Sequence, residues 1–254
     1  MQSWHLDVQR ELIRNTVLTT SYIGEHGVHI WVLADLNQAS PCPATGSCAT
    51  LQARRPIAAF TGIEESIPAG FLSYNAMQVK LEHRFSDGLY FLNSFTWARA
   101  IDNASGHLDT PNNDNSRVNL ANLPGERGES AYDQPLNDTV TMVLDLPFGT
   151  GRRWGGNSPR LLNSLLGDWQ FTAIDTATSG QPVNLIYNIS SGATVSGLLN
   201  YRPNVSGNPV TKSGQRIKTP TAVTNYLSSA NVSIPDAAHP YGNAGRNTVR
   251  GYPF

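Results

Sequence analysis

The sequence lacks long apolar runs, and no stretch approaches the roughly 18 consecutive apolar residues of a membrane-spanning helix. Charged residues are also scarce, at 15% of the chain, whereas an ordinary soluble domain has about 25%. Neither sign of charge dominates, because the formal net charge is −1. A helical membrane protein is therefore excluded, and no nucleic-acid partner is expected, since such a partner requires a basic excess.

Cysteine is nearly absent as well, with Cys42 and Cys48 as the only two. Both lie in the loop-like stretch SPCPATGSC at residues 40–48. We expect them to form a small-loop disulfide in an oxidising compartment. Two free thiols are the alternative. A metal site would need further ligands nearby, and none stand out in the sequence.

Motifs of enzymes and of cofactor sites are missing too. The chain has no Gly-x-Ser-x-Gly elbow, no phosphate-binding Walker loop and no Cys-x-x-Cys pair. His26 and His29 have metal-like spacing but no acidic partner in register, so we expect a structural role at a strand end. Residues 102–114 hold oxygen ligands that suit calcium, yet without the spacing of a defined calcium loop. We therefore expect no catalytic residue, no cofactor and no metal.

What the sequence does contain is many turn residues, with 22 Gly and 16 Pro, between segments that alternate apolar and polar residues. This period-two pattern predicts β-strands. We expect six antiparallel strands at residues 4–12, 16–23, 77–85, 89–100, 139–146 and 169–187. The fold class is therefore all-β.

One face of the predicted strands is apolar and the other polar. The apolar face is expected to point outward, toward lipid, and it includes Val79, Leu81, Phe91, Phe95, Val140, Met142 and Leu144. The polar face would then line an aqueous lumen. Arg10 interrupts the apolar face of the first strand. Seven aromatic residues fall near strand ends, as the interface girdles of membrane barrels do: Trp4, Tyr22, Tyr90, Trp97, Phe148, Trp154 and Trp169.

The predicted connections alternate between short and long. Residues 13–15, 87–88 and 149–167 make short connections, whereas 33–71, 102–133 and 188 onward make long ones. Compact soluble domains rarely have loops of that length, but outer-membrane barrels combine short turns with long outer loops. The pattern favours a transmembrane β-barrel, and a soluble β-sandwich with decorated loops is the alternative.

Several motifs in series resemble the late barrel region of Oar-like TonB-dependent transporters. They are YNAMQVKLEHRFSDG at residues 74–88, NSFTWARAID at 93–102, LPFGTGRRW at 146–154, LGDWQ at 166–170, TSGQP at 178–182, RPN at 202–204 and GNAGRNTVRG at 242–251. Glu126-Arg127-Gly128 and Tyr132-Asp133 are similar to the family's ERG and YD stretches. We expect these two to order the loop before the fifth strand through an arginine–carboxylate pair.

The resemblance implies a 22-stranded outer-membrane barrel that holds a plug and is opened by the TonB complex. The chain starts without a recognisable signal peptide and shows neither plug nor TonB box. We therefore expect residues 1–254 to be a fragment, a partial barrel that cannot close by itself. Its expected location is the bacterial outer membrane. The expected partners are the lipid bilayer, the TonB complex through the missing plug, and an unidentified substrate. The alternatives are a structural or adhesive barrel without transport, and a secreted glycan-binding β-protein.

Overall fold

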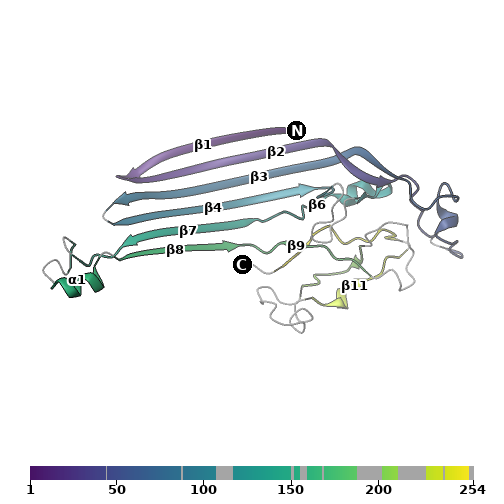
Figure 1. Ribbon diagram of the computed structural model, residues 1–254. Coiled ribbons are helices and arrows are strands. Elements are labelled where there is room, and N and C mark those ends of the chain that lie inside the picture. The colour runs from purple at the N-terminus through teal and green to yellow at the C-terminus, as the bar shows by residue number, and fades with distance from the viewer. Residues whose placement is uncertain are drawn as a thin grey trace.

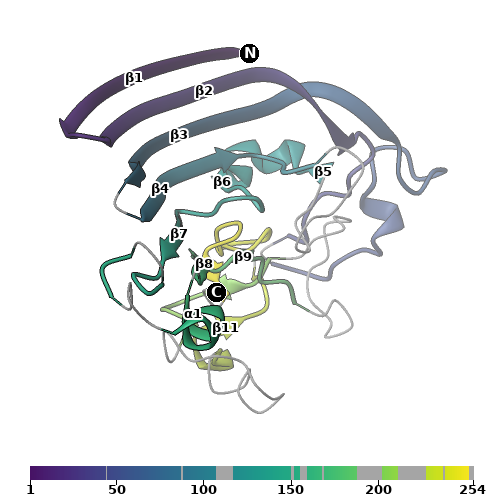
Figure 2. The same ribbon diagram turned by 60° about the vertical axis from the view of Figure 1, so that its left-hand side comes forward.

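A long, curved β-sheet forms most of the molecule, with irregular segments gathered at one end (Figures 1 and 2). The structure is a computed structural model. It describes residues 1–43, 45–86, 88–106, 117–149, 152–154, 159–167, 169–187, 202–210, 227–236 and 238–251. We name the two ends of the sheet by their connections. The turn end carries the connections that follow β1, β3 and β7, and the loop end carries those that follow β2, β4 and β8.

Six antiparallel strands lie side by side in chain order, which confirms the all-β prediction. They are β1 (Gln2–Ile13), β2 (Thr16–Asp35), β3 (Glu64–Ser86), β4 (Leu89–Asp102), β7 (Leu136–Asp145) and β8 (Gln170–Thr178). Within the described part of the chain, β1 and β8 pair on one side only and are the edges of an open sheet.

β2 and β3 extend much farther toward the loop end than the sequence analysis predicted. Residues 30–35 pair with residues 64–70 beyond a bulge at His29, whose φ is 56°. Of these, residues 33–35 and 64–70 had been assigned to a loop. Val32 and Ala34 of this extension are buried against Val118 of β5 (Arg117–Val118). This small core stabilises the extension, and a contact of such long sequence separation is not visible in local alternation.

The sixth strand, in contrast, is shorter than predicted. β8 ends at Thr178, and the chain continues into β9 (Pro182–Val183), which pairs with β12 (Val249–Arg250). The long connections also contain short elements that were not predicted: η1 (Gln52–Arg54), η3 (Leu120–Glu126), β6 (Gly128–Glu129), β10 (Asn204–Val205), η5 (Ser229–Asn231) and β11 (Val232–Ser233). α1 (Arg160–Leu166) lies in the connection between β7 and β8.

The strand register places the predicted apolar residues on one face. Directly opposed residues of antiparallel strands point to the same side of a sheet. The register contains the opposed pairs Val79–Phe95, Leu81–Asn93, Asn93–Val140, Phe91–Met142 and Leu89–Leu144. Because alternate residues of a strand share a face, these pairs put all seven predicted residues on the same side. We call this side the apolar face.

Several polar side chains share the apolar face, and four of them lie among its central rows. Arg10, Asn93 and Asp175 lie in one row across the sheet, and Asp138 lies in the next row. Asn93 Nδ2 donates a hydrogen bond to Asp138 Oδ1 at 2.6 Å. The sequence analysis noted only Arg10, so the face is less uniformly apolar than predicted.

The opposite face is polar and concave. It carries Ser94, Thr96 and Asp102 from alternate positions of β4. Arg246, near the C-terminal end of the described chain, bonds to Asp102, and Figure 2 shows this C-terminal segment under the arch of the sheet. The apolar face is therefore the convex one.

The turn end is built from tight connections and exposed aromatic rings. Gly88 has a φ of 82°, as the predicted two-residue turn requires; its partner Asp87 lies outside the described residues. Phe148 and Trp154 pack with their ring centroids 5.4 Å apart, and the Arg153 guanidinium lies 5.7 Å from the Trp154 centroid.

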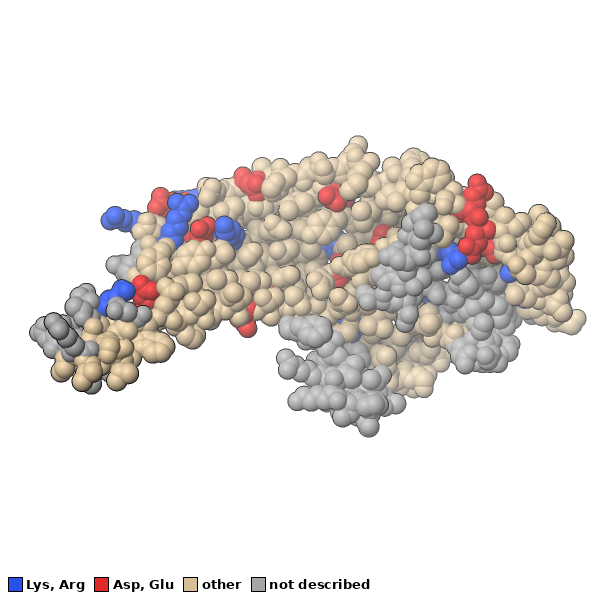
Figure 3. All heavy atoms as spheres, in the orientation of Figure 1, with Lys and Arg blue, Asp and Glu red and all other residues tan. Residues whose placement is uncertain are grey.

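In the view of Figure 3, most charged side chains lie toward the two ends of the sheet.

The connection between β2 and β3 contains the two cysteines of the chain. Cys42 and Cys48 are joined by a disulfide bond in the connection between β2 and β3. In the part of the chain that the structure describes, no helix has the length and apolar character needed to cross a membrane.

Candidate functional site at the loop end

Three arginines from the C-terminal part of the chain meet four carboxylates at the loop end of the sheet. The arginines are Arg202, Arg246 and Arg250, and the carboxylates are Asp102, Glu126, Glu129 and Asp133. We call this set the arginine cluster. All four carboxylates lie at the end of β4 or in the connection that follows it, so each ion pair joins segments far apart in the sequence.

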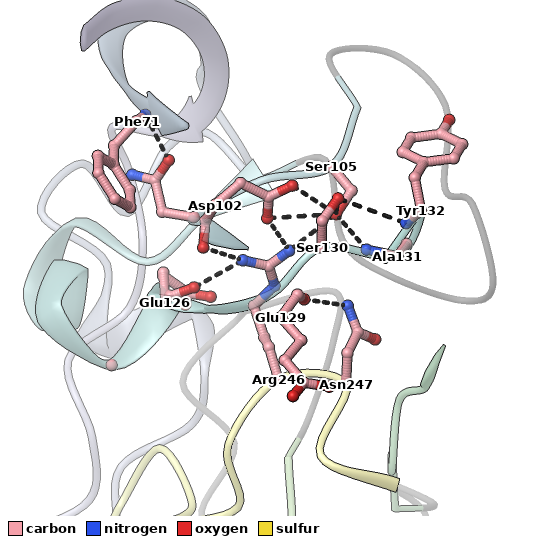
Figure 4. A network of polar contacts seen from close by, with 12 residues as sticks. Phe71, Asp102, Ser105, Glu126, Glu129, Ser130, Ala131, Tyr132, Arg246 and Asn247 are labelled. Atoms are coloured by element: carbon pink, nitrogen blue, oxygen red, sulfur yellow. Dashed lines mark hydrogen bonds and ion pairs between the residues drawn. The ribbon is translucent and has the colours of Figure 1, made fainter. Parts of the chain in front are cut away.

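Arg246 is the most deeply buried of the three arginines, with 2% of its side chain exposed. Its Nη2 donates to Asp102 Oδ1 at 2.6 Å and to Ser105 Oγ at 3.0 Å. Its Nη1 donates to the carbonyl oxygens of Asp102 and Glu126 at 2.9 and 2.7 Å (Figure 4). The planar guanidinium fork matches this set of acceptors, which an ammonium group cannot reproduce.

Ser105 extends the contacts of Arg246 into the neighbouring loop. Its hydroxyl donates to the Asp102 carboxylate and accepts a hydrogen bond of 2.8 Å from the backbone N–H of Ala131 (Figure 4). On the other side of the cluster, Asn247 Nδ2 donates to the Glu129 carbonyl at 2.8 Å. The guanidinium of the buried arginine therefore has the polar acceptors that a buried charge requires, whereas the buried Asn247 Oδ1 has no hydrogen-bond partner among the described residues.

Arg202 and Arg250 flank Arg246. Arg202 bonds to Glu126 Oε1 at 3.2 Å and to the Gly125 carbonyl at 2.7 Å, and both side chains of this ion pair are less than 10% exposed. Arg250 reaches Glu129 Oε2 at 2.6 Å, the Asp133 carboxylate and the Asp133 carbonyl. Asp133 also accepts from the backbone N–H of Ala100, so this carboxylate connects the C-terminal segment to β4.

Two glycines permit this close packing. A Cβ on Gly128 would lie 2.7 Å from Arg246 Cβ, and one on Gly242 would lie 2.1 Å from the Arg202 carbonyl oxygen. Gly242 also has a φ of 75°, in the left-handed region that favours glycine. A side chain at Gly128 would separate the C-terminal segment from the loop that follows β4, and a side chain at Gly242 would displace the backbone of Arg202.

The cluster brings together motifs that the sequence analysis treated separately. Glu126 and Asp133 belong to the ERG and YD stretches, whereas Arg246 and Arg250 belong to the GNAGRNTVRG motif. The expected arginine–carboxylate pairing is present, but the partners are distant arginines. The adjacent Arg127 instead lies 5.5 Å from the centroid of the Phe71 ring. The arginines of the GNAGRNTVRG motif were visible in the sequence as candidate partners for these carboxylates. Sequence spacing alone, however, does not show which arginine pairs with which carboxylate.

A cavity of about 600 Å³ adjoins the cluster, near the level at which β7 begins. β7 starts opposite Trp97, so β4 extends past it toward the loop end. The cavity is lined by Trp97 and Arg99 of β4, by three cluster residues, and by Tyr22, Asn75, Ala76, Met77, Ala98 and Pro135. Its wall thus combines aromatic and apolar surface with charged groups, a combination suited to a small organic ligand.

A second cavity of about 400 Å³ lies among the outer connections. Asp35 and Arg55 line it and are paired at 3.1 Å. Among the described residues, the buried Nε of Arg55 has no hydrogen-bond partner. Tyr241 also lines the cavity, and burial raises the pKa of its phenol, which therefore stays a neutral donor at physiological pH. This cavity offers hydrogen-bond donors to an acceptor-rich ligand.

The residues weighed for metal binding do not assemble a site. Across the described ranges, no group of three or more His, Cys, Asp or Glu side chains is placed to hold a metal ion. His26 packs edge-on against Phe71 with ring centroids 5.8 Å apart, and His29 occupies the bulge. Asp102 is engaged by Arg246, and most of the loop weighed for calcium lies outside the described residues.

Comparison with known proteins agrees with the geometry of the sheet. The family model described as "Outer membrane beta barrel domain" matches residues 1–254. Neither curated proteins nor solved structures give a match. The match covers the whole chain, and it accounts for a curved antiparallel sheet with an apolar convex face and short turns at one end. The chain belongs to the outer-membrane β-barrel domain family, and its place is the bacterial outer membrane.

Proposed function

We propose that the chain forms part of the wall of an Oar-like TonB-dependent transporter and has no enzymatic activity. In this proposal the concave polar face lines the lumen, the outer connections admit an unidentified substrate, and a plug coupled to the TonB complex opens the passage. Residues 1–254 would be the partial barrel region. The apolar face would contact the lipid bilayer.

The observation that carries the proposal is the arginine cluster. Separate stretches that resemble the transporter family meet there, and they anchor the C-terminal segment under the loop end of the concave face. A barrel that admits a solute needs ordered groups at the mouth of its lumen. The smaller cavity, among the outer connections, offers hydrogen-bond donors to such a solute.

The test concerns energy coupling. The reading frame upstream of the first residue is expected to encode a plug with a TonB box. Photo-crosslinkers placed in that box should capture TonB in living cells, and deleting the box should abolish the capture. A reading frame without a plug, or crosslinking that survives deletion of the box, would contradict the proposal.

A structural or adhesive barrel without transport is the second candidate. The extension of β2 and β3 beyond the other strands supports it, because β2 alone has 20 residues, whereas a membrane-crossing strand needs about 9–11. Such a barrel would hold its loops at the cell surface without TonB. Cell adhesion that is lost with the gene but kept without TonB would favour this second candidate.

A further inference from the structure

We propose that a hollow at the loop end of the apolar face, lined by Arg99 and Arg127, binds the phosphate of an outer-leaflet lipid headgroup. This site is separate from transport. It rests on the outer-membrane location and on the geometry of the described residues.

The first step is the position of Arg99. Arg99 is opposite Asn75, which is opposite Gly24, which in turn is opposite Trp4. This row is on the apolar face, because Trp97 and Phe95 precede Arg99 at alternate positions of β4. Arg99 therefore points outward, one row beyond Trp97.

The second step is the level of this row relative to the membrane. Trp97 lies eight residues after Leu89, or about 27 Å along the strand at about 3.4 Å per residue. At a strand tilt of about 35–45°, this length corresponds to about 19–22 Å of height, and Arg99 lies about 5 Å higher. The apolar band of an outer-membrane barrel is about 25 Å tall and is flanked by aromatic girdles. Trp97 is 59% exposed and Tyr22, in the same row, is 42% exposed. They fit the outer girdle, and Arg99 follows at the level of the headgroups.

The third step is the shape of the site. The hollow has a volume of about 680 Å³. Ile101 and Pro124 contribute apolar surface to its lining, and Gly245 and Thr248 of the C-terminal segment also line it. It is large enough for a phosphate with part of the sugar that carries it.

The fourth step is charge. Arg99 and Arg127 are both exposed, and neither forms an ion pair with any residue that the structure describes. Arg127 lies over the Phe71 ring, which holds its guanidinium in place. The other charged groups of the hollow are already engaged: Glu129 by Arg250 at 2.6 Å, and Arg246 by Asp102. Two positive charges thus face the headgroup region without a protein counter-ion.

A phosphorylated lipid fits these observations better than free phosphate. Basic pockets on the sides of membrane proteins bind lipid headgroups, and a phosphate at the end of an acyl-chain-bearing sugar would be held at this level by the bilayer itself. The apolar face directly below, with Phe95 and Val79 opposed across β3 and β4, would contact the acyl chains of the same lipid.

The experiment is a native mass spectrometry titration of the protein extracted from outer membranes in detergent. The probes are diphosphorylated lipid A, lipid A stripped of its phosphates, and inorganic phosphate. The double variant Arg99→Gln/Arg127→Gln should bind diphosphorylated lipid A about thirtyfold more weakly, since each arginine near an anionic membrane surface contributes roughly fivefold. Arg10→Gln, which removes an arginine from the same face near the turn end, should bind like the parent.

Two charge-preserving variants, Arg99→Lys and Arg127→Lys, should keep most of the affinity, and far-UV circular dichroism should be the same for all variants. The proposal is overturned if the double variant binds like the parent with its β-structure intact. It is also overturned if dephosphorylated lipid A binds equally well, or if inorganic phosphate at equal concentration displaces the lipid.

Discussion

At the scale of single residues, buried charge is what holds the C-terminal segment to the sheet. Arg246 is 2% exposed and Asp102 is 5% exposed, so each charge depends on the other for compensation. A buried pair of this kind is not necessarily more stable than an apolar replacement of both partners. What it provides is a defined geometry, since the guanidinium fork bonds at once to β4 and to the loop that follows it.

Replacing Arg246 by Ala should destabilise the folded protein by about 3–5 kcal/mol, because Asp102 would remain as an uncompensated buried charge. Arg152→Ala is the matched control. Arg152 pairs with Asp145 at 3.3 Å but is 39% exposed, and exposed pairs contribute about 0–1 kcal/mol. Denaturant unfolding in detergent, followed by tryptophan fluorescence, measures both. If the two variants lose the same free energy of unfolding, the burial of Arg246 is not the cause of the destabilisation.

Cys42 and Cys48 give a second prediction at this scale. Protein taken from the outer membrane should contain the Cys42–Cys48 bond seen in the structure, because that compartment is oxidising. Intact-mass analysis after alkylation without reductant should find no modified thiol, and reduction should expose two. Two alkylated thiols before reduction would refute the prediction.

At the scale of elements, the sheet depends on the alternation of its strands. β7 presents Met142 and Leu144 to the apolar face and Thr141 to the concave face. A one-residue shift of register would reverse these sides for the whole strand. The pairing of β7 with both β4 and β8 fixes the register, and the alternation then decides which side is compatible with lipid.

Leu144→Arg should therefore weaken folding into bilayers. An arginine on the lipid face costs roughly 2–4 kcal/mol at the midplane and less toward the interface, and Leu144 lies opposite Leu89, at the turn-end side of the apolar band. Thr141→Arg, in the same strand, faces the aqueous side and should have a much smaller effect. Folding efficiency into vesicles, measured as a function of urea concentration, compares the two. The assignment of the faces is wrong if Leu144→Arg folds as well as the parent, or if the order of the two effects is reversed.

At the scale of the whole molecule, the sheet described by the structure is open. Its edge strand β1 is exposed along its whole length, and β8 is the other edge. Unpaired backbone N–H and C=O groups at such edges are costly in lipid. In water, the edges and the apolar face favour aggregation.

The 254-residue chain expressed alone should accordingly be insoluble without detergent and should not form a heat-modifiable, protease-resistant barrel. The smallest single-chain barrels use about eight strands, whereas six form the path of this sheet. Gel mobility with and without boiling, together with limited proteolysis, tests this. A monodisperse, cooperatively unfolding monomer in plain buffer would contradict it.

The sequence by itself determined the strands of the membrane-facing part, their order and their two faces. Alternation over residues such as Val79 and Leu81 is a local property, and antiparallel neighbours joined by short turns can pair in few other ways. The cysteine pair was also predicted, because its members lie only six positions apart in a loop-like stretch. No such local signal marked the loop-end halves of β2 and β3, where a bulge at His29 breaks the alternation.

Only the tertiary structure decided which arginine meets which carboxylate. Arg246 and Asp102 are 144 residues apart, and neither spacing nor composition indicates that they are partners. Nothing in the sequence indicated that Arg99 and Arg127 line one hollow, because Arg99 belongs to β4 and Arg127 to the connection that follows it. Strands are specified by their own alternation, whereas a buried ion pair or a hollow exists only after distant segments have folded against one another.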